Sequence, residues 1–231
     1  MKNNLHILIA SLAAALFSLS SASASQVALE GAEPGEWTMD YDAALALAEE
    51  ENLPLLLNFT GSDWCGWCKL MDGQVFAEEE WQDWAADNLV LVTIDFPSDE
   101  SIVPEKYKAR NDELSETFGV QGYPTYILLA SDGETMIDQL GAGQDKTPES
   151  FIEEVETSLM MSPSNLEAKV EELGPEKGAE LQAAINARAE GIEKLETWIA
   201  TEPVRNPENE KKFEAFLKTI TEADEKIKSF F

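Results

Sequence analysis

The hexapeptide Trp64-Cys65-Gly66-Trp67-Cys68-Lys69 contains both cysteines of this 231-residue chain. Two thiols spaced i and i+3 fit the first turn of a helix, where the backbone places them side by side. The positive end of the helix dipole and the free N–H groups there favour a thiolate at Cys65. One thiolate can attack a partner disulfide, and its neighbour can resolve the mixed intermediate. The motif therefore indicates reversible disulfide exchange.

Three other interpretations of the two cysteines compete with a redox role. A structural zinc site needs about four ligands, and the one histidine, His6, sits in the N-terminal leader, so no metal site is expected. A structural staple would close a ring of only four residues, which stabilises by about 2 kcal/mol in the chain-entropy treatment. The third is a pair of reduced core cysteines, and the flanking Trp64 and Lys69 argue against it because they suggest a partly exposed surface.

The first 24 residues are typical of a secretory signal peptide. Met1-Lys2-Asn3-Asn4 is a weakly basic start, residues 5–19 are mostly apolar, and Ala22-Ser23-Ala24 supplies an A-x-A cleavage pattern. We expect cleavage after Ala24 and a mature protein that is periplasmic or secreted. The apolar run is shorter than the roughly 18 to 20 residues that span a membrane, and no later segment looks long and apolar enough to do so.

Acidic residues dominate the chain, with 45 Asp and Glu against 16 Lys and Arg. Such a charge repels phosphates, so no nucleic-acid partner is expected. A strongly acidic surface keeps a protein in solution, and it could also attract cationic substrates. Removal of the leader removes His6, which excludes catalysis by an imidazole base.

Residues 37–160 alternate between helical and strand patterns, which predicts an α/β domain. The expected helices cover 40–52, 65–71, 76–87, 105–118 and 147–160, and the expected strands cover 55–59, 89–94, 125–130 and 135–140. A hairpin turn signal, Ser131-Asp132-Gly133-Glu134, joins the last two strands. Thr147 and Pro148 provide an N-cap and a proline at N1 for the last helix. Residues 25–36 lack periodicity, so we expect a flexible tether there.

Residues 161–231 are expected to form an all-α extension. Gly174-Pro175 breaks one short helix and starts the next. Apolar positions then recur at steps of three and four residues between 181 and 199, and again over 213–230; Arg188 is the one polar residue among the spaced positions of the first stripe. The two stripes predict an antiparallel helical hairpin. The hairpin either packs on itself and on the preceding domain, or it joins two copies in a homodimer or binds a partner.

Two motifs give residues 37–160 a resemblance to the thioredoxin family. The hexapeptide at 64–69 matches the active-site motif of that family, and Gly122-Tyr123-Pro124-Thr125 matches its cis-proline turn at the expected separation. The stretch 58–65 is similar to secreted bacterial thioredoxin-like proteins and to the tail domain of periplasmic disulfide-interchange transporters. The resemblance implies a thioredoxin fold, in which helices flank a central mixed sheet. It also implies that no cofactor is needed beyond the redox-active disulfide of Cys65 and Cys68.

The resemblance assigns roles to the residues of both motifs. It implies that Cys65 is the exposed attacking thiol and that Cys68 is the buried resolving thiol. Pro124 would be cis, and the backbone at Tyr123 would pair with a bound peptide. The expected substrate-binding surface around the cysteines comes from Trp64, Gly66 and Trp67. Simple packing is nearly as good an explanation for Trp64.

One buried position departs from the family pattern. Thioredoxins usually carry an aspartate at the position of Asn58, thought to help deprotonate the resolving thiol, and the lysine that often accompanies it falls at Leu91. Because asparagine cannot accept that proton, we expect attack by Cys65 to survive and release by Cys68 to be slow or to rely on water. The alternative is that Asn58 simply forms hydrogen bonds in the core.

The sequence as a whole predicts a thiol–disulfide oxidoreductase that acts on secreted or periplasmic proteins and exchanges electrons with a redox partner protein. The competing interpretation is a non-enzymatic binding or scaffold protein whose CxxC motif is not turned over. The intact Cys65–Cys68 pair and Pro124 favour the enzyme. Asn58 and the long extension favour the scaffold.

Overall fold

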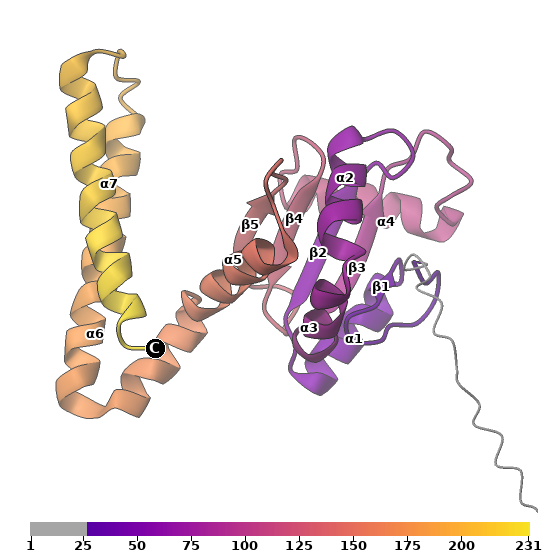
Figure 1. Cartoon of the computed structure of the whole chain (residues 1–231), viewed down its shortest axis with the longest axis horizontal. Helices are drawn as coiled ribbons and strands as arrows, with labels where there is room; N and C mark the ends of the chain where they lie inside the picture. The colour runs from indigo at the N-terminus through magenta and orange to yellow at the C-terminus, as the bar shows by residue number, and fades with distance from the viewer. Residues whose placement is uncertain (1–26) are drawn as a thin grey trace, which may run out of the picture.

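A computed structural model describes residues 27–231 of the chain. The expected signal peptide and its cleavage site therefore lie outside the described residues. Figure 1 shows a sheet with helices on both faces and a long helical hairpin that stands apart from it. This arrangement confirms the predicted α/β domain with an all-α C-terminal region.

One five-stranded mixed sheet forms the centre of the domain. Its strands in chain order are β1 (Trp37–Thr38), β2 (Leu55–Thr60), β3 (Val90–Asp95), β4 (Thr125–Leu129) and β5 (Met136–Gly141). The order across the sheet is β1-β3-β2-β4-β5. β3 is parallel to both β1 and β2, whereas β4 is antiparallel to both β2 and β5. The central strand β2 therefore leads directly from the middle of the sheet into the cysteine motif.

Helices cover both faces of this sheet (Figure 1). One face is covered by α1 (Tyr41–Glu51) and α4 (Glu105–Thr117), and the other by α2 (Gly66–Met71), α3 (Glu79–Asn88) and α5 (Pro148–Met160). The Asp40 side chain caps α1 by accepting the N–H of Ala43, and Thr147 caps α5. The Thr147 cap was predicted from the sequence, because a capping side chain satisfies helix N–H groups only a few residues away.

The side chains of β2 alternate between two separate hydrophobic cores. Leu55 and Leu57 face α1 and α4, whereas Leu56 faces the layer of α2, α3 and α5. Burial of each leucine contributes about 1.5 to 3 kcal/mol. Asn58 and Thr60 have the same parity as Leu56, so both point toward the layer that contains α2. The sheet therefore places polar groups beneath the helix that carries the cysteines.

The helix that starts at the cysteine motif continues past its expected end. It runs from α2 into a π-helical segment, η1 (Asp72–Phe76), and α3 begins at Glu79 rather than at 76. Asp72 keeps right-handed helical angles, φ −56° and ψ −44°, and its N–H donates to the carbonyl oxygen of Cys68. Asp72 therefore lies one turn beyond Cys68 on a continuous helical backbone.

The described part of the expected flexible tether is packed on the domain, which corrects that expectation. The Ala28 N–H donates to Trp37 O at 2.8 Å, and the Met39 N–H donates to Ala28 O at 2.8 Å. The Gly35 N–H donates to Leu89 O at 2.9 Å. The segment makes isolated bridges rather than a regular element, so it carries no period that a sequence pattern could show.

Two long helices, α6 (Pro163–Ile199) and α7 (Pro207–Lys228), form the predicted hairpin (Figure 1). Gly174 has φ 72° and bends α6 at the predicted Gly-Pro break. The Arg188 Nε donates to Asp224 Oδ1 at 2.7 Å, which explains the polar position in the apolar stripe. The core of the hairpin comes from its own two helices and the short segments beside them. Within the described part of the chain, none of the helices combines the length and apolarity needed to cross a bilayer.

Candidate functional site

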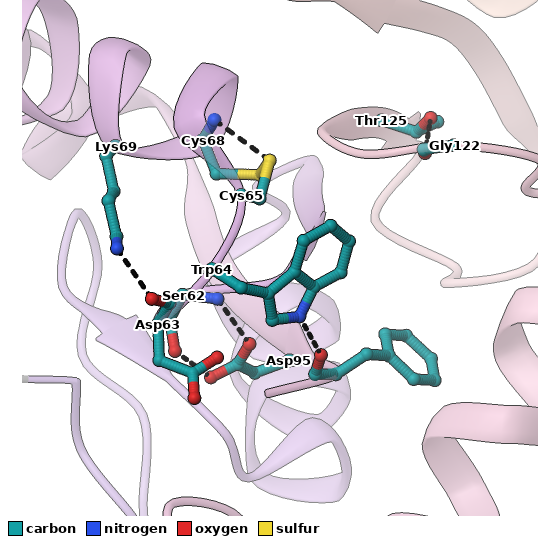
Figure 2. Close-up of a disulfide and its surroundings, with 10 residues drawn as sticks. Ser62, Asp63, Trp64, Cys65, Cys68, Lys69, Asp95, Gly122 and Thr125 are labelled. Atoms are coloured by element: carbon teal, nitrogen blue, oxygen red, sulfur yellow. Dashed lines mark hydrogen bonds between the residues drawn. A yellow bond between two sulfur atoms is a disulfide. The ribbon is translucent and has the colours of Figure 1, made fainter. Parts of the chain in front are cut away.

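Cys65 and Cys68 form a disulfide at the start of α2 (Figure 2). Their Cα atoms are 5.3 Å apart. Cys65 is the N-cap residue, and its sulfur accepts the backbone N–H of Cys68 at 3.1 Å. The first helical turn therefore directs an N–H donor and the positive end of its dipole at the Cys65 sulfur. Negative charge that develops there on reduction is stabilised by both.

Both cysteines are buried in this disulfide form. Cys65 is 5% exposed and Cys68 is 1% exposed. The expectation of an exposed Cys65 is therefore not met, because its sulfur is turned into the helix turn and bonded to Cys68. Of the two, Cys65 is slightly more exposed than Cys68.

Two tryptophans flank the disulfide with about half of their surface open to solvent, Trp64 at 51% and Trp67 at 50%. The Trp64 indole N–H donates to Phe96 O at 2.8 Å, so this ring is held in place as well as exposed. A Cβ atom at Gly61 would lie 2.4 Å from the Trp64 ring. Glycine at 61 is therefore what allows the ring to lie over the loop. Trp64 serves both as a packed residue and as part of an exposed apolar surface.

The second motif meets the first through an aromatic contact. The Tyr123–Pro124 peptide bond is cis, as the motif implied. The Tyr123 ring contacts the Trp64 ring edge-on, with centroids 5.8 Å apart. The Thr125 hydroxyl donates to Gly122 O at 2.8 Å and closes the turn (Figure 2). The fold therefore brings together residues that are far apart in the sequence, on one side of the disulfide.

The carboxylate of Asp63, two residues before Cys65, is held by a neighbouring loop. It accepts the backbone N–H groups of Ser98 at 2.8 Å and Asp99 at 2.9 Å. These hydrogen bonds hold the pKa of Asp63 below its usual range, so the group stays ionised. Lys69 donates its Nζ to the Asp63 backbone oxygen at 2.6 Å. Polar contacts that the sequence motif alone does not reveal therefore hold the backbone just before Cys65 in place.

A buried carboxylate, that of Asp95, also holds the segment before Cys65 through hydrogen bonds. Asp95, the last residue of β3, accepts the N–H and the hydroxyl of Ser62 (Figure 2). Asn111 Nδ2 donates to the Asp95 backbone oxygen at 3.0 Å. A sequence signal existed for this residue, because Asp95 directly follows an apolar strand run that ends at Ile94 and leads toward the motif edge of the sheet.

A cavity of about 260 Å³ lies between the sheet and the α2–η1 helix. Asn58 and Thr60 line it from the sheet and Asp72 from the helix. Surrounding protein, and then repulsion from Asp95, raise the pKa of Asp72 to about 6, although much of the residue is open to solvent. Burial also raises the pKa of Tyr126. Asp72 was not among the site residues predicted from the sequence; its spacing of four residues from Cys68 was the available signal.

Among residues 27–231, no group of three or more His, Cys, Asp or Glu side chains is arranged to hold a metal ion.

Comparisons with known proteins place similarity in the first part of the chain. A family model described as thioredoxin-like matches residues 36–131. The disulfide bond reductase DsbH of Chlamydia pneumoniae is 33% identical over 96 residues, which are 42% of this chain and 57% of DsbH. The thioredoxin-related protein DsbJ of the same organism is 31% identical over 111 residues, which are 48% of this chain and 31% of DsbJ. The match thus spans little more than half of DsbH and about a third of DsbJ.

A solved structure, described as DsbH oxidoreductase, resembles the fold of this chain. It has a TM-score of 0.50 and 26% sequence identity, and the match covers 63% of this chain and 92% of that structure.

Proposed function

We propose that this chain is a thiol–disulfide oxidoreductase acting through Cys65 and Cys68, because a thioredoxin-like family model matches residues 36–131. The observation that carries the proposal is the disulfide at the N-terminus of α2, beside the cis-proline turn. Exposed Trp64 and the Tyr123 backbone supply a surface on which a peptide can lie. The names of DsbH and DsbJ, a reductase and a thioredoxin-related protein, support this class of activity.

The reaction follows from the order of the two cysteines. In the reduced protein, the Cys65 thiolate attacks one sulfur of a substrate disulfide, forms a mixed disulfide, and releases the other substrate sulfur as a thiolate. Cys68 then attacks the Cys65 sulfur. The Cys65–Cys68 disulfide forms, and the bond between Cys65 and the substrate breaks. Two electrons pass from the dithiol to the substrate, so a redox partner protein must return them before the next cycle.

The reducing direction is the one we propose, because DsbH is named a disulfide bond reductase. The substrates would be proteins in the periplasm or outside the cell, reached through the signal peptide expected at 1–24. The acidic surface favours protein substrates over nucleic acid. No cofactor beyond the dithiol is required for this chemistry.

Reduction of a protein disulfide, followed as the rate of substrate precipitation or thiol release, tests the proposal. Wild type should turn over, Cys65→Ser should be inactive, and Cys68→Ser should form the mixed disulfide and stop there. A wild-type rate no higher than that of Cys65→Ser would favour the scaffold interpretation.

A further inference from the structure

The sheet surface beneath α2 changes from apolar to polar along the strands. Leu56 on β2 is followed on the same face by Asn58 and Thr60. On β3, Thr93 pairs with Asn58 and Asp95 pairs with Thr60. All four polar residues are less than a tenth exposed. Polar groups buried in this way are costly unless they find hydrogen-bond partners.

Three oxygens of this polar face have no hydrogen-bond partner within the described residues: Asn58 Oδ1, Thr60 Oγ1 and Tyr126 Oη. Tyr126 on β4 is directly opposite Asn58 on β2. Asn58 and Thr60 line the cavity of about 260 Å³. Because unpartnered polar atoms of Asn58 and Thr60 line part of this space, which is large enough for water molecules, we expect water to occupy that part of it.

Asp72 lines this cavity and lies one helical turn after Cys68. It lies four residues after Cys68, and its N–H donates to Cys68 O, so the helix is continuous between them. Side chains at i and i+4 share a helix face, with about 5 to 6 Å between their Cβ atoms. Cys68 is buried, whereas Asp72 lines the cavity and also reaches solvent. A proton that leaves Cys68 therefore has a carboxylate, and beyond it bulk water, within one helical turn.

The surroundings of Asp72 raise the pKa of its carboxyl group, which favours uptake of a proton. Asp95 on β3 repels its negative charge, and the neutral phenol of Tyr126 faces it from β4. No cation among the described residues acts on its pKa, which burial and Asp95 raise to about 6. A group that titrates near neutral pH can both accept and return a proton under working conditions.

We propose that Asp72 accepts the proton of the Cys68 thiol during resolution of the mixed disulfide, in place of the carboxyl that Asn58 does not provide. This inference rests on the proposed disulfide exchange. The Cys68 S–H gives its proton to the Asp72 carboxylate, directly or across one water. The Cys68 thiolate attacks the Cys65 sulfur, and the electron pair of the Cys65–substrate bond leaves on the substrate sulfur. Asp72 then loses its proton to solvent, and the released thiolate takes up a proton from water as its own pKa requires.

The two steps can be separated with a small aromatic disulfide whose thiolate absorbs visible light. Attack by Cys65 releases one thiolate, and resolution by Cys68 releases the second. In wild type the second phase should slow as the pH falls through about 6, the pKa of Asp72. Asp72→Asn should slow that phase roughly tenfold or more at pH 7, abolish its inflection near pH 6, and leave the first phase within about twofold.

Two further variants distinguish proton transfer from a structural effect. Asp72→Glu should keep most of the second-phase rate, and Asn58→Asp should restore it in the Asp72→Asn background. Asp87→Asn, which removes an exposed acid at the end of α3, controls for the loss of charge and should change neither phase.

The outcomes assign failure to one proposal or the other. Absence of any first phase in wild type contradicts the proposed function. A normal first phase, with a second phase and pH profile that Asp72→Asn leaves unchanged, contradicts the role of Asp72 alone. Failure of Asp72→Glu to retain the rate, together with failure of Asn58→Asp to restore it, would also overturn that role.

Discussion

Ser62 donates both its backbone N–H and its hydroxyl to the carboxylate of Asp95, at 2.9 and 2.6 Å. The pair is 33 residues apart in the chain and joins the loop before Cys65 to the end of β3. Asp95 is almost completely buried. If one of its donors is lost, water cannot easily reach the carboxylate oxygen to replace the hydrogen bond. The position of the cysteine motif relative to the sheet depends on this contact.

Ser62→Ala should lower the free energy of unfolding by about 1 to 2 kcal/mol, because one hydrogen bond to a buried charge is lost. Urea denaturation of the oxidised protein measures the change. Ser98→Ala is the matched control, since only the backbone N–H of Ser98 binds a carboxylate at this site and alanine retains it. Equal stability of Ser62→Ala and wild type would show that the contact contributes little.

The raised pKa of Asp72 predicts the pH dependence of stability. The folded state binds this proton more tightly than the unfolded state, so the contribution of Asp72 is fully present below about pH 4 and is lost as the pH rises through about 6. Asp72→Asn should therefore be more stable than wild type at pH 8, by about 1 kcal/mol once solvent screening of the exposed carboxyl is allowed for. The two proteins should differ little at pH 4.

Urea unfolding at both pH values tests this, with Asp87→Asn as the control for removal of one negative charge. A lower stability of Asp72→Asn at pH 8 would mean that ionised Asp72 is held by favourable contacts, which would reverse the assigned direction of its pKa.

Gly61→Ala should disturb the exposed aromatic surface, since its Cβ would meet the Trp64 ring at 2.4 Å. Overpacking of this kind costs about 1 to 3 kcal/mol unless the ring moves away. We expect the ring to move, so attack on a protein disulfide should slow several-fold while attack on a small aromatic disulfide changes less. Gly141→Ala is the control, because a Cβ there meets nothing within 4 Å. Equal slowing with both substrates would contradict a role of Trp64 in contacting proteins.

Local signals account for what the sequence predicted correctly. The cap at Thr147 acts within a few residues, and the apolar runs of β2 and β3 are long enough to identify buried strands. The two-residue strand β1 is too short to show a period. The bridges of residues 28–35 depend on partners that are distant in the chain.

The same distinction applies to the site. Cys65, Cys68 and Pro124 belong to short motifs, so they were predicted by number. The environment of Asp72 depends on the register of three strands, which brings Asn58 and Tyr126 under the helix. No single stretch of sequence contains that arrangement. The helical continuation from α2 into η1, which sets Asp72 over the cavity, was equally absent from the apolar pattern.

A chain that ends at Met160 tests the role of the hairpin. Every proposed redox residue precedes that point, and the hairpin packs mainly on itself, so disulfide exchange should be retained within about twofold. The hairpin exposes apolar side chains near its tip, including Ile199 and Val204, which are candidates for self-association. Light scattering should therefore give a monomer for the shortened chain and, if the hairpin forms a homodimer, twice the mass for the full mature chain. Loss of exchange in a shortened protein that remains folded would instead place part of the substrate site on the hairpin.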